Sequence, residues 1–185
     1  MCIRDSYSAD NQLGDEAEAR KGESRLWKYY EGIRKASTFI VNVDRCPELT
    51  MDEIADMKGQ ARFLRAYCYW ALIRVYGPVP LIPLEGLDVN LSYEELSLPR
   101  EHFDNLVDFI DQELAESARS LPTKRTVNNL GRPTRGAALG LRSRVLLYAA
   151  SPLFNGNTDQ ASVKNKDGKQ LFPQTEDNSK WAQAR

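Results

Sequence analysis

Few side chains in this sequence are suited to acid–base or nucleophilic catalysis. The chain has one histidine, His102, which lies among charged residues at the start of an amphipathic segment, where we expect it to be exposed. Ser/His/Asp and Cys/His arrangements both use a histidine as the base. No pair of carboxylates stands in an apolar setting that would separate their pKa values. We therefore expect a protein that is not an enzyme and that needs no cofactor.

Metal-binding patterns are equally weak. The spacing Asn155-x-Asn157-x-Asp159 resembles the start of a calcium loop, but its sixth position is not glycine, and Lys166 occupies the place of the bidentate acid. The cysteines are odd in number and widely spaced, which fits neither a zinc site nor a disulfide framework: Cys2, Cys46 and Cys68. We expect no metal site, and we expect Cys68 to be a small buried hydrophobic residue.

Composition excludes several other classes of function. The 185 residues are 42% hydrophobic and 28% charged, with a formal net charge of −1. That balance gives no general attraction to nucleic acid or to an anionic membrane. No run of 18 apolar residues is long enough to span a bilayer, and the first residues do not form a signal peptide.

The strongest structural pattern is a central helix between Thr50 and Gly77. Thr50 and Glu53 form a capping box at its start, while Gly77 and Pro78 end it. Apolar residues recur along it at spacings of three and four, as on one face of a helix. Arg62 and Arg65 lie beside this face, so at least one of them is expected to meet a carboxylate on a neighbouring helix; the candidates are Asp108, Asp111 and Glu113.

Three further helices are expected around the central one. They run from about Ser24 to Asp44, from near Pro99 to Leu121, and from about Thr134 to Ala150. The spacing Gly136-x-x-x-Gly140 predicts a close approach to a neighbouring helix. The central and fourth helices should share one packed cluster, with these residues buried: Phe63, Leu64, Tyr67, Cys68, Ala71, Leu72, Leu141, Val145 and Tyr148.

The expected organisation is a single partial domain. Residues 1–22 are a loop or a non-native stub, residues 23–150 form the helical core, residues 151–178 form an irregular loop with a turn at Lys166–Lys169, and residues 179–185 begin a truncated helix. A truncation there should leave apolar surface uncovered and make the isolated chain prone to aggregation.

Two stretches resemble the motifs of a known family. Residues 58–82, KGQARFLRAYCYWALIRVYGPVPLI, and residues 131–156, GRPTRGAALGLRSRVLLYAASPLFNG, are similar to the two signatures of the SusD/RagB family of outer-membrane nutrient-binding lipoproteins. Residues 27–44 resemble the family's preceding helix. Gln60 stands where the family usually has Glu. Members are several times longer and carry a signal peptide and a lipidated cysteine, so the chain looks like a fragment from the N-terminal half.

The resemblance implies an all-α fold of paired antiparallel helices, similar to tetratricopeptide repeats and decorated by long irregular loops. It also implies a lipoprotein at the surface of the outer membrane, attached only through an N-terminal lipid that this chain lacks. Such a protein captures an oligosaccharide or similar nutrient and passes it to a SusC-like TonB-dependent transporter. The alternative is a generic tetratricopeptide-like scaffold for protein interactions, although no regular 34-residue repeat is visible.

A sugar offers hydroxyl groups and apolar ring faces, so its site needs exposed aromatic rings beside amide and carboxylate groups. Periodicity assigns Phe63, Tyr67 and Trp70 to the core. The ligand-binding residues that we predict instead are Asp10, Asn11 and Trp27, in the polar N-terminal loop and at the start of the first helix. Packing of the Trp27 ring within the fold is the competing interpretation.

Overall fold

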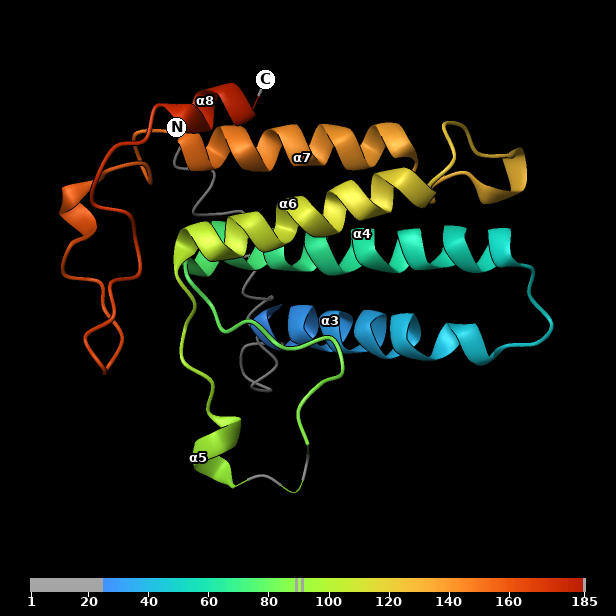
Figure 1. Ribbon diagram of the computed structural model, residues 1–185, viewed down its shortest axis with the longest axis horizontal. Coiled ribbons are helices and arrows are strands. Elements are labelled where there is room, and N and C mark those ends of the chain that lie inside the picture. Colours follow the sequence, from blue (N-terminus) through green and yellow to red (C-terminus); the bar gives the residue numbers. More distant parts are fainter. Residues whose placement is uncertain (1–24, 89, 91, 185) are drawn as a thin grey trace.

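Four helices stack in chain order in the computed structural model, which describes residues 25–88, 90 and 92–184. Each helix runs antiparallel to the one before it and packs against it (Figure 1). They are α3 (Arg25–Asn42), α4 (Met51–Tyr76), α6 (Phe103–Ser120) and α7 (Arg135–Ala150). The shorter helices are η1 (Val43–Arg45), α5 (Tyr93–Leu96), η2 (Val127–Asn129), η3 (Thr158–Gln160) and α8 (Ser179–Gln183).

The all-α class and the antiparallel helix pairs are thus confirmed. In the described part of the chain, the extended backbone forms only an isolated antiparallel bridge, between Lys164 and Gln170 beside the predicted turn. None of the helices described there is both long and apolar enough to cross a bilayer.

The central helix α4 begins and ends where the sequence predicts. The Thr50 hydroxyl accepts from the Glu53 amide at 3.3 Å, and the Glu53 carboxylate accepts from the Thr50 amide at 2.9 Å. Gly77 has a φ of 68°, and its amide donates to Ile73 O, which closes the helix.

The third long helix, α6, starts later than predicted. It begins at Phe103 rather than near Pro99, because the Glu101 amide donates to Val79 O and holds the backbone extended at that point. His102 is half-buried, not exposed, and its Nδ1 accepts from the Asp104 amide at 3.2 Å. The histidine therefore caps α6, which is a structural role.

A buried cluster of charges joins α4 to α6. Arg62 Nη1 lies 2.6 Å from Glu113 Oε1, and Arg65 Nη1 lies 3.7 Å from the same oxygen. The Arg65 side chain is 3% exposed, and its guanidinium stacks on the Phe109 ring, 4.8 Å from the ring centroid. The predicted meeting of these arginines with a carboxylate of the third helix is confirmed.

The same cluster holds the proline-rich segment that follows α4. Arg65 Nη2 donates to Ile82 O at 2.9 Å, and the Ile82 amide donates to the Tyr69 hydroxyl at 2.9 Å. The Tyr30 hydroxyl, from α3, donates to Pro80 O at 2.8 Å. Its prolines prevent this segment from forming a helix or a strand with regular backbone hydrogen bonds. Side chains from α3 and α4 therefore form hydrogen bonds with its backbone groups.

The predicted core is correct in part. Ala71, Leu72 and Val145 are buried, whereas four of the predicted residues are half-buried: Phe63, Cys68, Leu141 and Tyr148. The prediction is wrong for Leu64, which is 52% exposed, and for Tyr67, whose ring is stacked on Phe63 near the surface. In the described chain α4 is covered mainly by α3 and α6, so the part of its circumference that bears Leu64 and Tyr67 remains open.

The close helix approach also occurs at a different glycine from the predicted ones. A Cβ at Gly140 would meet no described atom within 4 Å, and one at Gly136 would meet only Thr134 Oγ1 at 3.9 Å. The tight approach is at Gly59 of α4, where an added Cβ would lie 3.0 Å from Ser120 Cβ on α6. The Gly59 carbonyl there accepts from the buried Ser117 hydroxyl at 2.8 Å.

We expect the two leucines of α4 to differ sharply in their effect on stability. Leu72→Ala should lower the free energy of unfolding by about 2–5 kcal/mol, because Leu72 is fully buried. Leu64→Ala should cost less than about 1 kcal/mol, because half of that side chain already faces solvent. Urea denaturation of both variants checks this, and equal losses would contradict the packing described.

Candidate functional site

The three tryptophans divide into one that belongs to the core and two that face solvent. Trp70 is buried and meets the Tyr148 ring edge-on, 5.0 Å between centroids. Trp27, in the first turns of α3, is 68% exposed, and Trp181, in α8, is 45% exposed. Exposed aromatic rings are the feature that a sugar site requires, so the surroundings of these two decide where such a site lies.

Trp181 borders an open hollow of about 400 Å³. This volume lies within the ordinary range of small-ligand sites. Two segments that are distant in sequence form it: the loop that follows α7, and the stretch that leads into α8. Its lining consists of Ala150, Pro152, Asn155, Gly156, Asn157, Thr158, Asp159, Glu176 and Trp181.

A group of aromatic rings fixes the loop that carries this hollow. Phe154 stacks on Phe103 of α6 at 4.5 Å and also contacts the rings of Tyr148 and Phe172. Phe103 and Phe154 are both buried. Since Phe154 directly precedes Asn155, this packing anchors one wall of the hollow to the helical core.

The other wall is attached by a reciprocal pair of hydrogen bonds. Asn155 Nδ2 donates to Asp177 O, and Asn155 Oδ1 accepts from the Asp177 amide, both at 2.9 Å. The neighbouring Gly156 has a φ of 74°, and a Cβ there would lie 2.5 Å from the Glu176 amide nitrogen. Only glycine therefore allows the two backbone segments to approach this closely.

Two carboxylates remain available to a ligand. The Asn155 side chain is already hydrogen-bonded to the backbone of Asp177. The Asn157 side chain donates to Leu153 O and accepts from the Asp159 amide. The side chains of Asp159 and Glu176 are exposed, and neither makes a hydrogen bond or an ion pair within the described chain. The hollow thus offers an indole ring beside two free acceptor groups, which suits the ring face and the hydroxyl groups of a sugar.

The predicted site residues are not seen together. Asp10 and Asn11 lie outside the described residues. The Trp27 side chain is 68% exposed, and it takes part in none of the ring–ring contacts between described residues. Its role in binding stays a prediction.

The sequence did not predict the Trp181 hollow, because no spacing of residues along the chain indicates it. The sequence shows an amide-rich loop at residues 155–159 and a tryptophan more than twenty residues later. What joins them is the pairing of Asn155 with Asp177, which has no sequence pattern. One signal of the hollow is present in the sequence. Asn155, Asn157 and Asp159, the residues that resemble the start of a calcium loop, carry side-chain oxygens at alternate positions.

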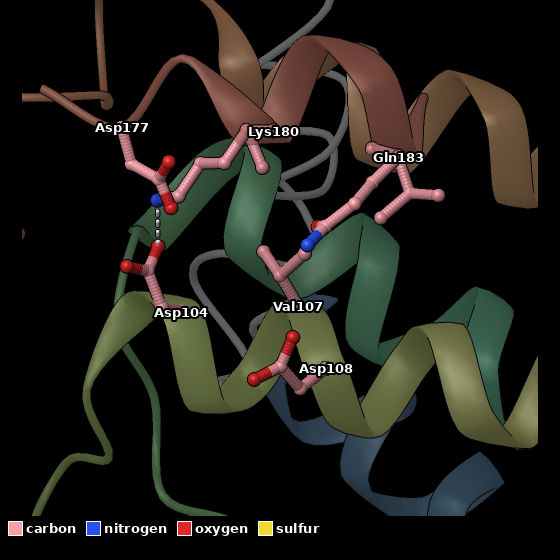
Figure 2. A pocket seen from close by; sticks show the side chains of 8 residues that line it. Asp104, Val107, Asp108, Asp177, Lys180 and Gln183 are labelled. Carbon is pink, nitrogen blue, oxygen red and sulfur yellow. Dashed lines mark hydrogen bonds and ion pairs between the residues drawn. The ribbon is translucent and has the colours of Figure 1, made fainter. Parts of the chain in front are cut away.

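A second hollow, of about 190 Å³, lies between α6, α7 and α8 (Figure 2). Lys180 reaches across it to Asp104, with Nζ 2.7 Å from Oδ1. Burial is the main cause that raises the pKa of the nearby Asp108 carboxyl, and hydrogen bonds from Ser179 lower the pKa of Asp177. Two of its charged groups neutralise each other and no aromatic ring lines it, so we interpret it as the junction that docks α8.

A third hollow is a broad groove of about 600 Å³ along α3, beside Phe39. No carboxylate lines it, and the Asn42 side-chain Nδ2 there donates to Thr38 O. It lacks the free carboxylates of the Trp181 hollow. Within residues 25–88, 90 and 92–184 no group of three His, Cys, Asp or Glu side chains is arranged to hold a metal ion.

Comparisons with known proteins agree on one family. Its SusD-like sequence profile, described as "Starch-binding associating with outer membrane", matches residues 2–147. SusD-like protein P25 of Formosa agariphila is 23% identical over 142 residues, which are 76% of this chain and 26% of that protein.

Solved structures give the same result. The protein named BT4246 is 31% identical, with a TM-score of 0.72 over 85% of this chain and 27% of its own. Surface glycan-binding protein A from Bacteroides uniformis is 26% identical, with a TM-score of 0.58 over 66% of this chain and 27% of its own. The chain therefore spans about a quarter of the length of these relatives.

Two glycines with positive φ provide a test of how the hollow is built. Gly168→Ala, at φ 83° in an open turn, should cost about 1–2 kcal/mol for the left-handed backbone alone. Gly156→Ala adds the collision with Glu176 and should cost about 1–3 kcal/mol more. Thermal and urea unfolding of the two variants measures the difference, and equal costs would show that the two walls are not in close contact.

Proposed function

Because the chain belongs to the SusD-like family, we propose that it is part of a surface protein that binds oligosaccharide without altering it chemically. Support comes from the family's description as starch-binding and associated with the outer membrane. The observation that carries the proposal is the exposed Trp181 ring beside the unpaired carboxylates of Asp159 and Glu176.

In this proposal the protein stands at the outer membrane and hands the bound sugar to a SusC-like TonB-dependent transporter. Binding without reaction suits the residues of the hollow, because its two acids lie at an open surface beside no described histidine or metal cluster. The indole ring would stack on the apolar face of one sugar unit, and the carboxylates would accept hydrogen bonds from its hydroxyl groups.

Trp27 is the second place where a sugar could stack. Its ring is more exposed than that of Trp181, but it lines none of the three hollows. We therefore place the sugar at Trp181 and retain Trp27, with Asp10 and Asn11, as a predicted accessory contact.

The test is a glycan array probed with this chain and with the full-length gene product, followed by calorimetry on the glycan that binds. Trp181→Ala should raise Kd about tenfold or more, and Trp181→Phe should raise it much less because an aromatic face remains. Trp27→Ala is the comparison variant, since it also removes an exposed indole from a helix of this chain; as an accessory contact, Trp27 should raise Kd less than Trp181 does when it is replaced by alanine.

Circular dichroism confirms that each variant is folded. If no glycan binds the full-length gene product, the proposed function is wrong. If a glycan binds and only Trp27→Ala weakens it, the function stands and the site lies at the start of α3.

A further inference from the structure

The connection between α6 and α7 has an unusual charge pattern. Between Glu116 and Asp159 the chain contains only basic ionisable side chains apart from Tyr148, although the net charge of the whole protein is −1. The basic residues are Arg119, Lys124, Arg125, Arg132, Arg135, Arg142 and Arg144. We call residues 122–135 of this stretch the cationic loop.

One arginine of the cationic loop points inward and fixes it. Arg125 Nη1 and Nη2 donate to the two Asp56 carboxylate oxygens of α4 at 2.7 and 2.8 Å. Its Nε and Nη2 also donate to Pro133 O across the loop, at 3.0 and 2.7 Å. The Arg125 side chain is buried in this contact. A bidentate pair of this kind holds a loop in one geometry.

The other cations of the loop are left for solvent. Lys124, Arg132 and Arg135 are exposed, and none of them forms an ion pair within the described chain. Arg132 makes one long hydrogen bond, from Nη1 to Gln60 Oε1 at 3.4 Å. Among the described residues, the carboxylate that contacts the loop is Asp56, and its charge is already neutralised by Arg125.

Two apolar side chains stand at the tip of the same loop. Val127, the first residue of the short helix η2, is 81% exposed, and Leu130, which directly follows that helix, is 72% exposed. The loop projects from the end of the helical stack in Figure 1, away from α8. Protruding apolar side chains beside cations suit the headgroup region of a membrane, where apolar groups can enter the acyl boundary while cations face the lipid phosphates.

We propose that the cationic loop docks on an anionic lipid surface. Val127 and Leu130 enter the boundary between headgroups and acyl chains, while Lys124, Arg132 and Arg135 contact lipid phosphates. Charge complementarity favours an anionic lipid surface. Three unpaired cations lie within 12 residues of one another on the loop, and the acid that contacts the loop, Asp56, is already neutralised by Arg125. Arg125 does not touch lipid and serves to hold the loop in position.

The test is flotation of this chain with vesicles of phosphatidylcholine alone and with phosphatidylglycerol added. Binding is expected only with phosphatidylglycerol and should fall as salt is raised, because salt screens exposed charges. Each neutralised cation, in Lys124→Gln and in Arg132→Gln, should weaken binding about fivefold. Val127→Ser with Leu130→Ser should remove most of the binding.

Matched controls come from the other end of the molecule. Lys166→Gln removes an exposed cation from the turn at residues 165–168, and Leu153→Ser removes an exposed apolar side chain. Both should leave flotation unchanged. Equal binding to neutral vesicles, no binding to anionic ones, or loop variants that float like the parent chain would each overturn the proposal. Loop variants that instead disrupt a complex with a protein would assign the surface to that protein.

Discussion

The fold depends on a pair of arginines that share one buried carboxylate. Glu113 of α6 accepts from Arg62 and lies beside Arg65, and burial raises the pKa of its carboxyl against the opposing pull of the two guanidinium groups. Arg65 also holds Ile82 and stacks on Phe109, so a single side chain connects α4, α6 and the extended segment after α4. Charges this deeply buried are tolerated only when each is paired, and removing one partner leaves the others without compensation. Hydrogen bonds of Tyr30 to Pro80 O and of the Ile82 amide to Tyr69 attach the proline-rich segment to α3 and α4 beside this cluster.

Local rules were sufficient to predict most of the helices. The capping box at Thr50, the helix end at Gly77 and the helix start near Thr134 are each determined by neighbouring residues, and all three occur as expected. Predictions that depended on which other helices pack beside a residue were less accurate. Leu64 and Tyr67 lie on an apolar stripe, yet they face solvent because no described helix covers that side of α4. Gly136 and Gly140 have the spacing of a helix contact without a described partner, whereas Gly59, which has no repeat spacing, makes the tight approach to α6.

The candidate site was beyond local rules for the same reason. That a sugar site needs an exposed ring beside acceptor groups could be stated from chemistry, and Trp27 satisfies the exposure at the start of its helix. The Trp181 hollow needs three long-range events: the stacking of Phe154 on Phe103, the pairing of Asn155 with Asp177, and the close approach at Gly156. None of these leaves a periodic pattern in the sequence. The family resemblance suggested the class of ligand as well as the fold, and the Trp181 hollow is the place where we propose that the ligand is held.

The most direct test of the central claim compares two glutamates of α6 by urea denaturation. Glu113→Gln leaves Arg62 and Arg65 without their carboxylate and should lower the free energy of unfolding by about 3–5 kcal/mol. Glu116→Gln breaks only the exposed pair with Arg119 on the same helix and should cost less than about 1 kcal/mol. A Glu113→Gln variant as stable as the parent chain would show that this buried pair does not hold the helices together.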